Sequence, residues 1–145
     1  MATIRRNAAA IKSVPMEIVP QQLSVALVDD ESAVRKALSR LLRSSGIQVE
    51  AFASGYEFVE CLRNGNWQLV LLDMHIPGLS GFEVLEQVRK ERPDLAVIMI
   101  TGYEGTDVRQ RAYEAGAQGF LLKPFMYSEL LDIVRALSGG TQAHA

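Results

Sequence analysis

Charged side chains stand where three apolar runs of this sequence end. Asp29 and Asp30 follow the run 25–28, Asp73 follows 69–72, and Lys123 follows 120–122. Because the carboxyl ends of strands in an open parallel sheet line up along one edge, we expect these groups to converge on one small site. Carboxylates held close together repel one another, and either protonation or a cation must relieve that repulsion.

An acidic site of this kind suits a divalent metal, with Lys123 supplying one further positive charge. Oxygen ligands with room for water favour Mg²⁺, whereas zinc is disfavoured because a second cysteine and a histidine cluster are missing. His75, two residues after Asp73, is the one rival ligand, although an imidazole in a loop is more often simply solvated. A carboxylate beside Mg²⁺ and an ammonium group can also attack phosphorus, because the cations neutralise charge on the transferred phosphoryl oxygens.

Asp73 is the best candidate for that nucleophile, because it stands alone after an apolar run and is followed by an accessible loop over 74–78. Thr101 could donate its hydroxyl to a phosphoryl oxygen, and Lys123 would supply a fixed positive charge. Each residue also has an ordinary structural interpretation: Asp30 could cap a helix, Thr101 could end a strand, and Lys123 could be a surface lysine. The joint spacing of these residues favours the chemical interpretation.

The elements that must position these residues alternate between strands and helices. Apolar runs of strand length predict strands over 23–28, 48–52, 68–72, 96–100 and 119–122. Helices are expected between 34 and Gly46, where Val34, Leu38, Leu41 and Leu42 form an apolar side, and over about 54–63, 81–91, 106–115 and 126–137. Five strand-helix units in alternation predict an α/β fold with a doubly wound parallel sheet and right-handed crossovers.

Length and composition indicate a single globular domain with loose ends. The chain has 145 residues, of which 48% are hydrophobic and 22% charged. We expect a flexible arm over 1–22, a domain over 23–138 and a flexible tail over 139–145. The formal net charge of −2 argues against direct nucleic-acid binding, and no apolar run is long enough to cross a membrane. The lone Cys61 excludes an internal disulfide and favours the cytoplasm.

Four segments together resemble the receiver domain of two-component response regulators. They are Val28-Asp29-Asp30-Glu31, the stretch 71–81, Ile100-Thr101-Gly102 and the stretch 119–125, and the similarity extends over about 23–137. The resemblance implies a flavodoxin-like five-stranded sheet with five helices and strand order 2-1-3-4-5. It also implies that Asp73 accepts a phosphoryl group from a histidine kinase or a histidine phosphotransfer protein.

The resemblance assigns the site residues to three groups. The implied Mg²⁺ ligands are Asp29, Asp30, Asp73 and the backbone carbonyl of His75. The implied phosphoryl-binding and switch residues are Thr101, Phe120 and Lys123, with the Thr101 hydroxyl moving toward the phosphoryl group and the Phe120 ring turning inward. The residues implied to shape the loops are Pro77, Gly102 and Pro124, with a cis bond before Pro124.

Phosphorylation is then expected to shift the face built from the fourth helix, fifth strand and fifth helix, through which the chain would control a downstream protein. The resemblance leaves room for a homodimer that forms on phosphorylation, and it implies no enzymatic activity beyond self-phosphorylation and slow self-dephosphorylation. Few residues follow Leu137, which favours a stand-alone regulator. The alternative is a receiver from a larger regulator with a separate DNA-binding or enzymatic output domain.

Three other functions are compatible with a doubly wound sheet. A flavodoxin-like electron carrier would hold FMN at the same edge, but Asp29-Asp30-Glu31 would repel its phosphate. An aspartyl-phosphate hydrolase would need a second Asp two residues after the nucleophile, where this chain has His75. A nucleotide-binding enzyme would need a glycine-rich Lys-Ser/Thr loop after a strand, and the sequence contains none.

Overall fold

Strands and helices alternate along the whole part of the chain that the structure, a computed structural model, describes, namely residues 22–102 and 105–143. In chain order the elements are β2 (Ser24–Val28), α3 (Ser32–Ser44), β3 (Gln48–Phe52), α4 (Gly55–Glu60), β4 (Leu69–Asp73), α5 (Gly81–Glu91), β5 (Ala96–Thr101), α6 (Thr106–Glu114), β6 (Gly119–Leu122) and α7 (Tyr127–Ala143). The alternation of five strands and five helices predicted from the sequence is confirmed within these residues.

The five strands form one parallel sheet in the order β3-β2-β4-β5-β6. This is the predicted order 2-1-3-4-5. In the register of the central strands, Leu72 of β4 lies opposite Val28 of β2 and opposite Met99 of β5. Since all strands run the same way, the residues that follow Val28 and Leu72 emerge side by side at one edge of the sheet.

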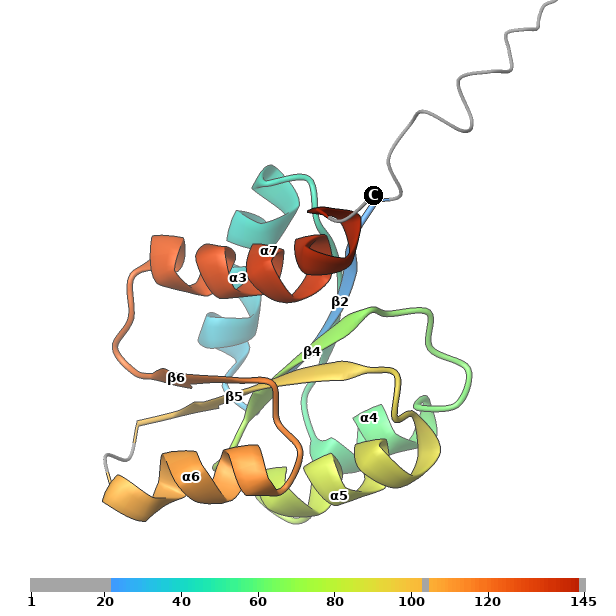
Figure 1. Cartoon of the computed structure of the whole chain (residues 1–145), viewed down its shortest axis with the longest axis vertical. Coiled ribbons are helices and arrows are strands. Elements are labelled where there is room, and N and C mark those ends of the chain that lie inside the picture. Colours follow the sequence, from blue (N-terminus) through green and yellow to red (C-terminus); the bar gives the residue numbers. More distant parts are fainter. Residues whose placement is uncertain (1–21, 103–104, 144–145) are drawn as a thin grey trace, which may run out of the picture.

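Helices cover both faces of the sheet. Helices α3 and α7 lie on one face and α4, α5 and α6 on the other (Figure 1). Strand β4 supplies both cores, because Val70 and Leu72 are fully buried on the side of α5, and Leu69 and Leu71 on the side of α3. Burial on two faces explains why this run is almost wholly apolar. Each such side chain contributes about 1.5–3 kcal/mol.

Helix α5 begins at a fixed point relative to the loop after β4. Ser80 accepts a hydrogen bond from the Glu83 N–H, and the Glu83 side chain accepts one from the Ser80 N–H, which together form a capping box. One residue later, the Gly81 N–H donates to the Met74 carbonyl at 3.2 Å. The loop that follows Asp73 is therefore tied down at both of its ends.

Strand β3 lies at one border of the sheet, where only β2 pairs with it. The Gln48 N–H and the Phe52 carbonyl hydrogen-bond toward the β2 side, so the Val49 carbonyl between them points away from β2. Arg43 of α3 donates its Nη2 to that carbonyl at 3.0 Å. A side chain from the covering helix thus occupies an outward-facing backbone acceptor of the border strand.

One residue of the predicted apolar side of α3 is not in the core. Leu41 is 39% exposed, whereas Leu38 and Leu42 are buried together with Ser39. Leu41 precedes Leu42 by 100° around the helix and lies at the border of the buried arc. Its carbonyl instead accepts a hydrogen bond from the Tyr127 hydroxyl at 2.9 Å, which joins the end of α3 to the start of α7.

The structure describes only part of the two predicted chain ends. The arm predicted over 1–22 lies outside the described residues except for Gln22, whose side chain donates to the Gly46 carbonyl and accepts from the Gln48 side chain, both at 3.0 Å. Helix α7 runs to Ala143, past its predicted end at Leu137, because a glycine pair lowers helix propensity without removing a backbone donor. Residues 144–145 of the predicted tail lie outside the described residues. No helix in the described part of the chain is long and apolar enough to cross a membrane.

Candidate functional site

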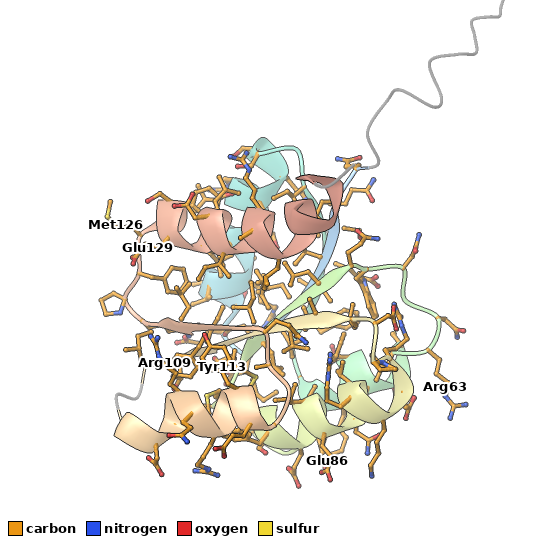
Figure 2. All side chains as sticks on the ribbon, viewed as in Figure 1. Arg63, Glu86, Arg109, Tyr113, Met126 and Glu129 are labelled. Atoms are coloured by element: carbon orange, nitrogen blue, oxygen red, sulfur yellow. The ribbon has the colours of Figure 1, made fainter. Side chains whose placement is uncertain are left out.

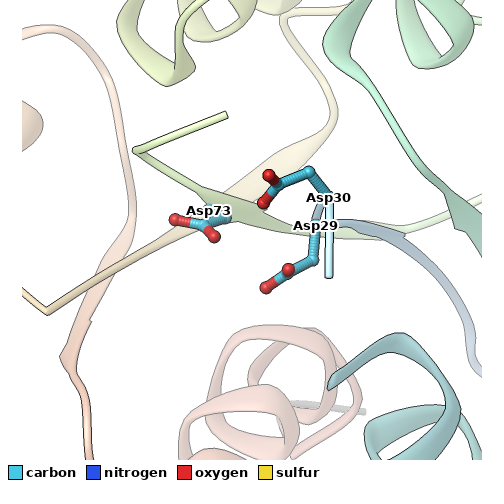
Figure 3. A group of neighbouring side chains, drawn as sticks. All are labelled: Asp29, Asp30 and Asp73. Atoms are coloured by element: carbon cyan, nitrogen blue, oxygen red, sulfur yellow. The ribbon is translucent and has the colours of Figure 1, made fainter. Parts of the chain in front are cut away.

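Three carboxylates meet at the carboxyl edge of the sheet. Asp29 and Asp30 directly follow β2, and Asp73 is the last residue of β4. One oxygen from each residue lies within 4.8 Å of those from the other two (Figure 3). The convergence predicted from the positions of these residues at strand ends is confirmed.

Each of the two buried carboxylates accepts the same kind of local hydrogen bond, from the backbone N–H two residues further along the chain. Asp29 and Asp73 are 3% and 7% exposed, whereas Asp30 is exposed. Asp29 Oδ1 accepts the Glu31 N–H at 2.9 Å, and Asp73 Oδ1 accepts the His75 N–H at 3.0 Å. An aspartate that bonds the backbone two residues onward has its side chain fixed by its own turn. Each carboxylate is therefore oriented before any ligand arrives.

Lys123 bridges the two buried carboxylates. Its Nζ lies 3.5 Å from Asp29 Oδ2 and 3.5 Å from Asp73 Oδ2. The backbone that carries it is fixed by a hydrogen bond from the Lys123 N–H to the Thr101 carbonyl at 2.8 Å. The interpretation of Lys123 as an ordinary surface lysine is wrong, because its charge is paired inside the cluster.

The electrostatics of the site show a shortage of positive charge. Burial raises the pKa of Asp29, and the negative charge of Asp73 adds to that rise against the opposing effects of the Glu31 N–H and Lys123. Burial alone would lower the pKa of Lys123, but the charges of Asp73 and Asp29 and its hydrogen bonds to them outweigh burial and raise it. Lys123 therefore remains an ammonium group, and one ammonium does not fully compensate three carboxylates.

The interpretation of Asp30 as a helix cap is also wrong. Glu31 holds the N-cap position of α3, and no side chain forms a cap hydrogen bond there. Arg35, which the sequence reasoning missed, donates its Nη1 to the Asp29 carbonyl at 2.8 Å. No sequence signal reveals this contact, because it depends on how the first turns of α3 fold back over the end of β2.

Thr101 and Phe120 lie on β5 and β6, the two strands that follow β4 in the order of the sheet. Thr101 is fully buried and follows Ile100, the register partner of Asp73. Phe120 lies on β6, one strand further, and is 6% exposed. Its ring therefore already occupies an inward position, in the same core cluster as Val108.

The residues predicted to shape the loops differ in their backbone geometry and in the space around them. The Lys123–Pro124 peptide bond is cis, as predicted, and Pro77 is exposed in the loop after Asp73. A Cβ atom on Gly102 would meet nothing within 4 Å, so space does not require glycine there. Gly81, which the sequence reasoning missed, is the crowded position, because a Cβ atom there would lie 2.6 Å from the Met74 Cα.

Known proteins are similar to this chain in sequence. The family model for the response regulator receiver domain matches residues 25–135. The chain is 37% identical over 113 residues to the response regulator MprA of Mycobacterium sp. strain KMS, covering 78% of this chain and 49% of that protein. It is 35% identical over 113 residues to the DNA-binding transcriptional regulator NtrC of Klebsiella pneumoniae, covering 77% of this chain and 24% of that protein. The chain thus spans half or less of the length of these relatives.

Solved structures agree with the sequence matches. A response regulator receiver domain protein from Methanospirillum hungatei JF-1 superposes with a TM-score of 0.80 at 27% identity, covering 86% of this chain and all of that one. The response regulator TrrA of Thermotoga maritima, solved in complex with Mg²⁺ and beryllofluoride, superposes with a TM-score of 0.73 at 31% identity, covering 80% and 99%. From its matched segment, its strand order and its carboxylate cluster together, we conclude that this chain belongs to the receiver domains of two-component response regulators.

Proposed function

We propose that Asp73 is the phosphoacceptor of this receiver domain and takes its phosphoryl group from the phosphohistidine of a kinase or of a phosphotransfer protein. The observation that carries the proposal is the position of Asp73, whose carboxylate stands at the end of β4 close to two other carboxylates and to the Lys123 ammonium. A nucleophile in that place lies next to the positive charge that a phosphoryl group needs.

The donor set of the cluster fits Mg²⁺. It consists of oxygen atoms alone, from Asp29, Asp30 and Asp73, and the exposure of Asp30 leaves one side open to water. The backbone carbonyl of His75 would complete the protein ligands. When bound, Mg²⁺ would neutralise charge on the phosphoryl oxygens. The similarity to TrrA, which was solved with Mg²⁺ and beryllofluoride, supports this assignment.

The transfer itself needs little from the protein beyond position and charge. An oxygen of Asp73 forms a bond to phosphorus while the nitrogen–phosphorus bond of the donor histidine breaks, and the bonding electron pair returns to the imidazole, which takes up a proton from water. Lys123 lies 3.5 Å from Asp73 Oδ2 and would hold a phosphoryl oxygen. Thr101 would donate a hydrogen bond to another phosphoryl oxygen. Apart from its own phosphorylation and slow dephosphorylation, the domain would convert no substrate.

The response would be read on the face formed by α6, β6 and α7. Thr101 connects Asp73 to Phe120 in this face, because its strand β5 lies between β4, which carries Asp73, and β6, which carries Phe120. A phosphoryl group that accepts a hydrogen bond from Thr101 would stabilise one arrangement of this face over another. A downstream protein, or a second copy of the chain, would bind the stabilised arrangement.

The test is phosphorylation of the purified chain by acetyl phosphate with Mg²⁺, followed by intact mass spectrometry. We expect one phosphoryl group on the wild-type chain and none on Asp73→Asn. The matched control is Asp132→Asn, which makes the same change at an exposed position on α7 and should accept phosphate normally. Phosphate that persists on Asp73→Asn would place the acceptor elsewhere.

A second candidate concerns the output rather than the acceptor. The chain spans 49% of MprA and 24% of NtrC, and NtrC is a DNA-binding transcriptional regulator. The domain would then control an output domain covalently joined to it instead of a separate partner. For either output, we propose a cytoplasmic location, because the free thiol of Cys61 is compatible with a reducing compartment.

A further inference from the structure

Helix α6 is held to the rest of the fold by a small contact. Of its side chains that the structure describes, only Val108 and Ala112 are buried. Two arginines of the same helix lie over aromatic rings on neighbouring elements. The guanidinium carbon of Arg109 lies 5.3 Å from the ring centroid of Phe120 on β6, and that of Arg111 lies 4.9 Å from the ring centroid of Phe82 on α5.

The arginine over Phe120 separates that ring from solvent. Phe120 is 6% exposed, whereas Arg109 is exposed, so the guanidinium covers the outer side of a buried ring. Arg109 and Tyr113, one turn apart, extend from α6 toward β6 (Figure 2). Within residues 22–102 and 105–143, no carboxylate lies at ion-pair distance from Arg109. The Phe120 ring is therefore the main contact described for this charge.

We propose that Arg109 is a positioning residue that holds the Phe120 ring inward before any phosphoryl group is present. To leave its buried place, the ring would have to displace the guanidinium and also give up its contacts in the core that contains Val108. The functional meaning of the contact between Arg109 and Phe120 rests on the proposed role of Asp73, because Phe120 is connected to Asp73 through Thr101. Arg109 sets how much of the inward arrangement exists before phosphorylation.

The size of the effect follows from the exposure of Arg109. A cation–π contact at an exposed site changes an equilibrium by about two- to fivefold. Loss of the charge should shift the ratio of inward to outward ring by about that factor. The apparent affinity for a ligand that needs the inward ring falls with the fraction of competent molecules, and so by no more than the same factor.

The experiment follows the ring directly. The chain is labelled with 4-fluorophenylalanine, and the Phe120 signal in the fluorine NMR spectrum is assigned with Phe120→Tyr. Arg109→Met keeps an unbranched apolar side chain and removes the charge, while Arg109→Lys keeps the charge. The matched control is Arg111→Met, which breaks the equivalent contact on the same helix with Phe82. Binding of beryllofluoride with Mg²⁺ and thermal unfolding are recorded for each variant.

We expect Arg109→Met to move the Phe120 signal toward that of an exposed ring and to weaken beryllofluoride binding by up to about fivefold. Arg109→Lys should lie between this variant and the wild type, Arg111→Met should leave the signal in place, and saturating beryllofluoride should return Arg109→Met to the wild-type signal. An unchanged Phe120 signal in Arg109→Met overturns the proposal. Equal shifts in Arg109→Met and Arg111→Met also overturn it, because they would reveal general loosening of α6.

The same data separate this proposal from the proposed function. A wild-type chain that fails to bind beryllofluoride would contradict the role of Asp73. The Phe120 signal of the unliganded variants would still decide whether Arg109 positions the ring. If the wild type binds beryllofluoride and Arg109→Met matches it in every readout, the proposed role of Asp73 is supported and the proposed role of Arg109 is contradicted.

Discussion

Asp29, Asp30 and Asp73 form a site that is electrostatically incomplete on its own. Two unit charges 4 Å apart interact by about 4 kcal/mol at an effective dielectric constant near 20, so each close pair of carboxylates weighs against the folded state. Lys123 compensates part of this repulsion through its contacts with Asp29 and Asp73. The repulsion that Lys123 does not compensate favours the binding of a positively charged ligand.

Removing the exposed carboxylate should separate metal binding from folding. We expect Asp30→Ala to weaken Mg²⁺ binding about tenfold or more, because it removes one negative charge and one oxygen ligand. Without metal, the melting temperature should stay the same or rise, because repulsion is relieved and no cap hydrogen bond is lost. Calorimetric titration and thermal unfolding measure the two effects, with Asp132→Ala as the exposed control. A variant that does not fold would show that Asp30 supports α3 instead.

The raised pKa of Asp29 predicts how stability depends on pH. The folded protein holds this proton more tightly than the unfolded chain, whose value is near 3.8, so Asp29 lowers the stability of the metal-free protein as pH rises through its higher folded pKa. Asp29→Asn removes this titration and keeps an oxygen for the Glu31 N–H. In urea unfolding without Mg²⁺, the variant should therefore gain stability relative to the wild type between acidic and neutral pH. A difference that stays constant with pH would contradict this account.

How far the site could be predicted depends on the kind of contact. Asp29, Asp73 and Lys123 were predictable because each stands at the carboxyl end of a buried strand, and parallel strands bring such positions together. The contacts of Arg35 with the Asp29 carbonyl and of Arg109 with the Phe120 ring were not. Both depend on the direction that a long side chain takes between two elements, which residue spacing does not specify.

At the level of elements, the close approach of α5 to the loop after β4 fixes the position of the site. Gly81 is the first residue of α5, and an added Cβ atom would lie 2.6 Å from the Met74 Cα and 3.0 Å from the Asp73 carbonyl oxygen. Both of these neighbours are backbone atoms and cannot rotate away. The capping box at Ser80 prevents the helix from starting elsewhere. The helix and the acidic loop must therefore move together.

We expect Gly81→Ala to destabilise the fold by about 1–3 kcal/mol, the usual range for overpacking a tight site. Because the displaced atoms belong to the backbone between Asp73 and His75, Mg²⁺ affinity should fall as well. Urea unfolding and metal titration measure the two effects. Gly102→Ala is the matched control, since its Cβ atom would meet nothing within 4 Å. Equal stability of the two variants would show that the loop after β4 yields without strain.

The sequence predicts the interior of elements better than their ends. The strands were located within about one residue, and for β2, β4 and β5 this is because burial on two faces demands continuous apolar runs. Helix α4 ends at Glu60 rather than near Arg63, because the next residues form tighter turns, with the Cys61 N–H donating to the Phe58 carbonyl. These turns bring Trp67 back against Phe58, with ring centroids 5.2 Å apart. The end of the helix thus goes together with a ring contact between Phe58 and Trp67, which the apolar pattern of the helix does not specify.

For the molecule as a whole, alternation of apolar runs was enough to predict a doubly wound sheet, because right-handed crossovers leave few ways to arrange five such units. The strand order β3-β2-β4-β5-β6 was predictable only from the resemblance to receiver domains. Alternation by itself also permits other doubly wound orders. The burial of β4 on both faces agrees with its place inside the sheet.

Metal binding should stabilise the entire fold, since the three carboxylates come together only in the folded state. Mg²⁺ at one hundred times its dissociation constant should add about 2.7 kcal/mol, and a chelator should reverse the gain. Thermal unfolding with and without Mg²⁺ measures this change. The gain should be much smaller in Asp73→Asn and unchanged in Asp132→Asn. A gain of the same size in Asp73→Asn would mean that Mg²⁺ acts away from the site.

The contact between Arg43 and Val49 has a consequence for crowded solutions. A strand with an unused border is a template on which another molecule can extend a sheet, and such growth leads to aggregation. Here an incoming strand would first have to displace a charge-assisted hydrogen bond to the Val49 carbonyl. It would also have to approach helix α3, which carries Arg40 and Arg43. If the incoming strand belongs to a second copy of the chain, the same arginines of the two copies would repel each other. We therefore expect the domain to resist open-ended polymerisation at the border that β3 leaves exposed.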